Sequence, residues 1–147
     1  MPANAYLYPA DILLPDFERV NGTVYATVAC DQFTSQPEYW EKADAAAGTA
    51  PSTLRMILPE IYLSEAESRI PQIHETMEKY IRDVLNVHKN SMIYVERTQS
   101  DGKVRHGLVG MVDLEQYDYH RGATTLIRAT ESTVEERIPP RLAVRQG

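Results

Sequence analysis

Apolar residues recur at helical spacing over residues 64–84, and this is the strongest periodic signal in the chain. Ser64 followed three residues later by Glu67 is typical of a capping box at a helix start. The pattern therefore predicts a helix with a kink or a restart at Pro71, because proline removes one backbone hydrogen bond and crowds the preceding turn. The apolar face of this predicted helix is formed by Ala66, Ile70, Ile73, Met77, Ile81 and Val84.

A second helix is predicted over residues 37–47. Pro37 suits the first helical turn, Ser35 just before it is a candidate cap, and Gly48 ends the helical pattern. Near the end of the chain, Ser132 or Thr133 is expected to cap a short helix that Pro139-Pro140 ends.

Short runs rich in β-branched or aromatic residues predict strands. A buried strand is expected over TVYATVAC, directly after the turn signal Asn21-Gly22. The turn signal Ser100-Asp101-Gly102 separates two further runs and predicts an antiparallel hairpin. The predicted strands cover residues 23–30, 54–58, 92–98, 104–114 and 124–129, with the first residues of another at 142–144.

These elements predict an α+β fold with a mixed, mainly antiparallel sheet and two or three helices packed on it. A chain of 147 residues has the length of one domain, so we expect a single α+β domain over 1–147. The apolar run at 142–144 has no following segment to pair with, which suggests an N-terminal fragment of a longer protein.

Composition excludes several classes of protein. The single Cys30 cannot form an intramolecular disulfide, and no Cys/His cluster has metal-ligand spacing. The formal charge of −6 disfavours general binding to nucleic acid, which requires a basic face. No segment resembles a signal peptide or approaches the roughly 18 apolar residues of a membrane span. We therefore expect a cytoplasmic protein with no nucleic-acid partner, no membrane partner and no resident metal.

The charge is unevenly distributed, and the C-terminal stretch from Arg128 to Arg141 is rich in candidate chemistry. Residues 1–60 carry eight acids against three bases, whereas residues 121–147 carry five arginines against three glutamates. A strand-to-helix turn with arginines nearby favours anions, because free helix amides and guanidinium groups both bind phosphate or carboxylate. The alternative is a surface network of Arg/Glu salt bridges. The candidate anion ligands are Arg128, Arg137, Arg141 and Thr133, and the candidate catalytic carboxylates are Glu131 and Glu136.

Further residues are candidates to line a binding site. Asp31 and Gln32 follow the predicted strand 23–30, and ligands often gather beyond the carboxyl ends of strands. Their alternative role is to form a turn by bonding nearby backbone. Arg97 and Arg105 lie on facing strands of the predicted hairpin and could bind one ligand, although Arg105 could instead pair with Glu96.

A small acidic and aromatic cluster follows the predicted hairpin. Its carboxylates could hold Mg²⁺, but the cluster is also typical of a solvated strand end. It comprises Asp113, Glu115 and Asp118, with Tyr117 and Tyr119 between them.

Five blocks of the chain together carry a family resemblance. The blocks are ACDQFTSQPEYW (29–40), PSTLRMILPEIYL (51–63), IYVERT (93–98), HGLVGMVDLEQYDY (106–119) and IRATESTVEERIPPR (127–141). They resemble the family of uncharacterised proteins known as domain of unknown function 1015. The resemblance implies whole proteins more than twice this length, whose remaining part carries a segment like that of ParB-like free serine kinases. A phosphoryl-transfer site would then be shared between the two parts.

Two functions follow from these observations. The first is part of a small-molecule enzyme that binds a phosphorylated substrate or a nucleotide, with Mg²⁺ and ATP as its cofactors only if the reaction is kinase-like. The second is a non-catalytic binding or assembly module that docks on the C-terminal remainder of its own chain or on a partner protein.

Overall fold

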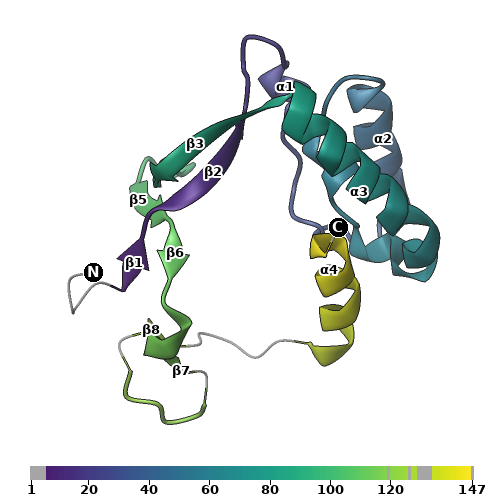
Figure 1. Cartoon of the computed structure of the whole chain (residues 1–147). Helices are drawn as coiled ribbons and strands as arrows, with labels where there is room; N and C mark the ends of the chain where they lie inside the picture. Colours follow the sequence, from purple (N-terminus) through teal and green to yellow (C-terminus); the bar gives the residue numbers. More distant parts are fainter. Residues whose placement is uncertain (1–5, 119, 126, 129–133, 147) are drawn as a thin grey trace. The chain divides into compact units, whose positions relative to one another are not determined.

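The computed structural model describes residues 6–118, 120–125, 127–128 and 134–146. The chain divides into two compact units, which are described separately below. Unit 1 comprises Met1–Leu14 and Val87–Ser132, and unit 2 comprises Pro15–Asn86 and Thr133–Gly147. The whole chain contains both helices and strands, which confirms the predicted α+β class (Figure 1).

Unit 2 contains the α-helices of the described residues and all but one of their 3-10 helices. The longest is α3, whose neighbours in unit 2 include η1, η2 and α4. The elements are α1 (Gly22–Tyr25), α2 (Pro37–Ala47), η1 (Thr53–Met56), η2 (Glu60–Glu65), α3 (Ala66–Asp83), η4 (Glu135–Arg137) and α4 (Ile138–Arg145), where η denotes a 3-10 helix.

The core of unit 2 is small and includes one buried polar residue. Ser52 is 2 % exposed, and its main-chain N–H donates to the hydroxyl of Tyr80 at 3.0 Å. Its own hydroxyl donates to the carbonyl of Tyr25 at 3.2 Å, so the buried polar groups are satisfied. Burial raises the pKa of the Tyr25 phenol, with a smaller contribution from Tyr80. The buried hydrophobic residues are Val20, Tyr25, Trp40, Ala47, Leu58, Ile73, Tyr80 and Val84.

The two long helices were predicted correctly, but their predicted N-terminal caps were not. Gly48 ends α2 with φ 52°, a backbone conformation that favours glycine. No side-chain cap bond is made at Gln36, the actual N-cap of α2. Likewise Ser64 lies inside η2, and α3 begins at Ala66. The helix continues through Pro71, and the break in helical backbone falls earlier, at Tyr62.

The predicted strands at residues 23–30 and 54–58 were wrong. The side chain of Asn21 accepts a hydrogen bond from the Thr23 amide and starts α1, and Ser52 caps η1 in the same way. The carbonyl of Tyr25 accepts hydrogen bonds from the hydroxyls of Ser52 and Thr53 instead of pairing with a strand. Side-chain hydrogen bonds thus satisfy backbone groups here. The β-branched residues alone had predicted that these groups would pair in a sheet.

The end of the chain also differs from its prediction. Residues 135–137 form the expected short helical turn as η4, but Pro139-Pro140 does not end it. The prolines lie in the first turn of α4. Backbone N–H groups in a first turn have no partner within the helix, so proline loses no helical hydrogen bond there. Residues 142–144 are therefore helical, and the strand predicted there was wrong.

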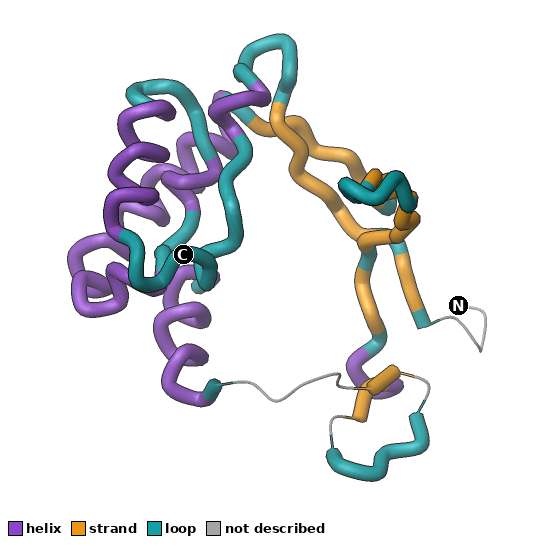
Figure 2. Tube along the Cα trace, turned by 180° about the vertical axis from the view of Figure 1, so that it is seen from behind, coloured by secondary structure: helices purple, strands orange, loops and turns teal. Residues whose placement is uncertain are grey.

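Unit 1 is built from strand pairs (Figure 2). The turn and the pairing of the hairpin were predicted correctly: β4 and β5 are antiparallel, and Gly102 turns the chain between them with φ 80°. The second strand is shorter than its predicted range of 104–114, because β5 ends at Val109 and Leu114 lies in η3. The pair β1 and β6 is antiparallel, β7 and β8 are parallel, and β2 pairs with β3. The strands are β1 (Leu7–Tyr8), β2 (Ala10–Pro15), β3 (Leu85–Ser91), β4 (Ile93–Thr98), β5 (Val104–Val109), β6 (Met111–Val112), β7 (Tyr117–Asp118) and β8 (Ile127–Arg128), with η3 at Leu114–Gln116.

Candidate functional site

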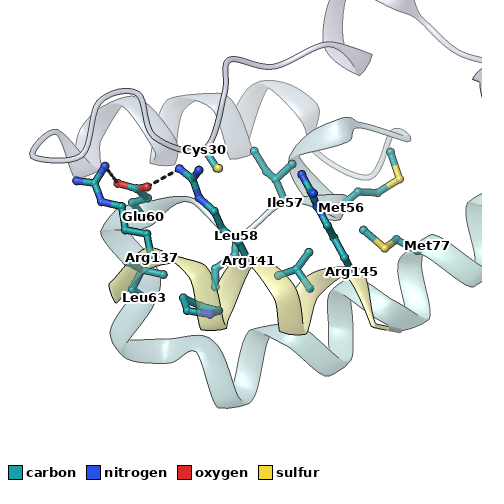
Figure 3. Close-up of a pocket in the computed structure, with 12 residues that line it drawn as sticks. Cys30, Met56, Ile57, Leu58, Glu60, Leu63, Met77, Arg137, Arg141 and Arg145 are labelled. Atoms are coloured by element: carbon teal, nitrogen blue, oxygen red, sulfur yellow. Dashed lines mark hydrogen bonds and ion pairs between the residues drawn. The ribbon is translucent and has the colours of Figure 1, made fainter. Parts of the chain in front are cut away.

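A pocket of about 230 Å³ opens in unit 2 where α4 lies beside α3 and the segment from η1 to η2 (Figure 3). Its walls combine aliphatic and methionine side chains with three arginines and one buried carboxylate. The lining residues are Cys30, Met56, Ile57, Leu58, Glu60, Leu63, Met77, Arg137, Pro140, Arg141, Val144 and Arg145.

The three arginines reach the pocket because of their spacing. Arg137, Arg141 and Arg145 follow one another at intervals of four residues through the end of η4 and along α4. Side chains four residues apart lie on the same helix face. The helix therefore directs all three guanidinium groups toward the same side, as Figure 3 shows.

Glu60 is the centre of the charged part of the pocket. Its side chain is 6 % exposed. One carboxylate oxygen accepts a hydrogen bond from Arg141 Nη2 at 2.8 Å, and Arg137 Nη1 lies 3.2 Å from the other oxygen. The main-chain N–H of Glu60 donates to the carbonyl of Cys30 at 2.8 Å. A buried carboxylate thus joins η2 to both arginines through charge-assisted contacts.

Asp31 contributes a second, weaker contact to the same arginine. Its carboxylate lies 3.5 Å from Arg141 Nη2. The hydrogen bond to Glu60 is the main cause that raises the pKa of the Arg141 guanidinium, and Asp31 adds to the effect. Gln32 has no comparable role, because its side chain is exposed and its main-chain N–H donates to the carbonyl of Ala29 in a turn.

Arg145 differs from the other two arginines. Within the part of the chain that the structure describes, it forms no ion pair. Its side chain extends beside Met56 and Met77, which form the apolar end of the pocket (Figure 3). Arg145 is therefore the lining residue that has a positive charge and no carboxylate partner among the described residues.

His74 holds α4 in place from α3. Its Nε2 lies 3.0 Å from the carbonyl of Ala143 and 3.2 Å from that of Val144, where the ring N–H donates. These carbonyls belong to the last turn of α4, where helical hydrogen-bond partners run out. The carbonyl of Ala143 also accepts a hydrogen bond from the main-chain N–H of Gln146 at 3.3 Å. The sequence does not indicate this contact, because no motif marks an interaction between residues that are 69 positions apart.

The other candidate residues are distributed between the two units. Glu136 lies in η4 and is exposed. Arg128 belongs to unit 1, on β8, where its backbone is opposite Asp118. Arg97 also belongs to unit 1 and faces Arg105 across the hairpin. Glu131 and Thr133 lie outside the described residues.

The acidic cluster after the hairpin makes local contacts. Asp113 accepts a hydrogen bond from the Glu115 amide at 3.1 Å and caps η3. Asp118 accepts hydrogen bonds from the amide and the ring of His120, and these bonds lower the pKa of its carboxyl. Within the described ranges, no group of three or more His, Cys, Asp or Glu residues could hold a metal ion.

The folding pattern and the pocket define the chain as an α+β protein with an arginine-lined pocket in its helical unit. It belongs to the family described as "Protein of unknown function (DUF1015)", which matches residues 14–147. No curated protein and no solved structure matches the chain. The helices formed by described residues include none with the length and apolar character needed to cross a membrane.

Proposed function

We propose that unit 2 binds a phosphorylated small molecule in the arginine-lined pocket. The observation that carries this proposal is the placement of three arginines at four-residue spacing along one side of a pocket whose other walls are apolar. Such a pocket suits a ligand with an anionic group at one end and an uncharged body at the other.

The balance of charge supports an anionic ligand. Among the described residues, the ion pairs of these three arginines involve two carboxylates, those of Glu60 and Asp31. Each guanidinium group has five N–H donors, so the two paired arginines keep donors for a ligand. Arg145 forms no ion pair among the described residues, so we assign to its guanidinium group the first contact with the anion.

The volume of the pocket favours a small ligand. About 230 Å³ is less than the roughly 300–1,000 Å³ of typical ligand pockets. A phosphorylated compound smaller than a nucleotide therefore fits the proposal better than ATP does. Glu60 is occupied by two arginines, so we give it the role of positioning them and not that of a general base.

Calorimetric titration of the full chain with inorganic phosphate, glycerol 3-phosphate and ATP tests this proposal. We expect glycerol 3-phosphate to bind. Arg145→Ala should weaken the affinity for this compound by about tenfold or more, the usual effect of losing one hydrogen bond to a charged group. The matched control is Arg82→Ala, because Arg82 is an exposed arginine of the same unit whose partner is Glu78 on α3. This control should leave the affinity unchanged.

Cys30 provides an independent measurement of occupancy. It is the only cysteine of the chain and it lines the pocket. A bound phosphate ester should slow the reaction of its thiol with a disulfide reagent, and Arg145→Ala should remove that protection. Absence of both heat and protection with all three phosphates would refute the pocket proposal. Co-elution with the C-terminal remainder of a longer chain would then favour a docking module.

A further inference from the structure

The hairpin of β4 and β5 has one face with a distinct chemistry. Directly opposite residues of an antiparallel pair point to the same side of the sheet. The register therefore places three opposite pairs on one side, which we call the arginine face. Val95 and Val109 on this face are 41 % and 51 % exposed. The arginine face consists of Ile93, Val95, Arg97, Arg105, Gly107 and Val109.

The hairpin lacks the cover that such a structure needs. Among the described residues, β4 and β5 pair only with each other. Every residue of the two strands is exposed except Ile93, which is half-buried. An isolated two-stranded hairpin is marginally stable in water, and stable examples pack a face against another element. The arginine face is thus an uncovered surface that a bound partner would stabilise.

The charges on this face indicate what that partner carries. Arg97 and Arg105 lie directly opposite each other, and like charges in this position destabilise a strand pair. Neither arginine forms an ion pair within the described part of the chain. The neighbouring carboxylate of Glu96 points to the other face, where it lies 3.7 Å from the ring of His106. An anion bound between the two arginines would remove their repulsion.

We propose that the arginine face docks an acidic segment of a partner protein that also carries aliphatic side chains. A second copy of this face is a poor partner, because the face has two arginines and no carboxylate. Nucleic acid is also a poor partner: half of the face is aliphatic, and the aromatic ring of Tyr94 lies on the opposite side. An acidic segment matches the arginines, and its aliphatic side chains cover Val95 and Val109.

Fluorescence anisotropy of the full chain with a short fluorescein-labelled peptide of alternating glutamate and valine tests the proposal. We expect this peptide to bind, and peptides of alternating lysine and valine, or glutamate and serine, to bind at least about tenfold more weakly. Backbone amide NMR shifts should change in β4 and β5. A single-stranded DNA oligonucleotide that binds more tightly than the acidic peptide would overturn the proposal.

The most informative variant is Arg97→Glu. It replaces a repulsive cross-strand pair with an attractive one, so the hairpin should keep or gain protection from hydrogen exchange. The same variant should weaken binding of the acidic peptide by about tenfold or more. Arg121→Glu is the control, because it makes the same change of charge at an exposed turn of unit 1. An equal loss of affinity in both variants would mean that only net charge matters and would contradict a defined docking face.

Discussion

The contacts of Glu60 with Arg137 and Arg141 join distant parts of the chain. Glu60 and Arg141 are 81 residues apart in the sequence. The sequence points to Glu131 and Glu136 as the carboxylates of the arginine-rich stretch, because these residues are its neighbours along the chain. Among the described residues, the carboxylate that contacts both Arg137 and Arg141 is that of Glu60, which follows Pro59 far upstream. Local spacing can show that arginines gather on one helix face, but it cannot reveal which distant acid they contact.

Glu60→Gln should destabilise unit 2 by about 1–3 kcal/mol, because it leaves two guanidinium groups without their common carboxylate. The estimate lies below the cost of breaking a fully buried pair, since both arginines are 43 % exposed. Urea denaturation followed by Trp40 fluorescence measures the change. The control is Glu41→Gln at an exposed position of α2, which should change the free energy of unfolding by less than about 0.5 kcal/mol.

Added phosphate separates a structural role of Glu60 from a role beside a ligand. In the Glu60→Gln variant the two released arginines should bind inorganic phosphate, which stabilises the folded state by mass action. Phosphate should therefore raise the urea midpoint of the variant more than that of the unmodified chain. An equal rise in both proteins would contradict the placement of these arginines beside an open anion site.

Elements with strong local signals were predicted well. The helices α2 and α3 follow from apolar spacing and from Pro37 and Gly48, and the hairpin follows from Asp101-Gly102. The weaker strands failed where the decisive contact is distant. The carbonyl of Tyr25, for example, accepts hydrogen bonds from hydroxyls that are 27 and 28 residues away. No local pattern indicates these bonds.

The attachment of α4 depends on His74 and is testable at the level of that helix. His74→Ala should lose the hydrogen bonds to the last turn of α4 and cost about 1 kcal/mol. Amides of residues 141–145 should then exchange hydrogen faster, while those of α2 should not change. Glu75→Ala, at the adjacent exposed position of α3, is the control. Unchanged protection of α4 in His74→Ala would show that the apolar pocket wall alone holds the helix.

At the scale of the whole molecule, burial is concentrated in one unit. All of the described residues that are buried belong to unit 2, whereas unit 1 exposes Tyr94, Leu108, Met111 and Leu114 among others. Hydrophobic burial is the main source of folding free energy. Unit 2 should accordingly supply most of the stability of the chain.

A shortened chain in which a flexible Gly/Ser linker replaces residues 87–132 tests this expectation. It should retain helical circular dichroism and a cooperative unfolding transition, because the core and the pocket are both formed by unit 2. Trp40, the only tryptophan and 2 % exposed, reports the transition by fluorescence. Loss of cooperative unfolding in the shortened chain would show that unit 1 is required for folding of unit 2.

The sequence by itself determined the α+β class, the two long helices, the hairpin and the family to which the chain belongs. These features rest on short-range periodicity, turn residues and motifs that neighbouring positions carry. Only the tertiary structure decided that Pro139 and Pro140 lie in the first turn of a helix, and that Arg137 and Arg141 meet Glu60. The physical reason is that a buried ion pair and a pocket depend on groups far apart in the chain, whose meeting is set by packing and not by local preference.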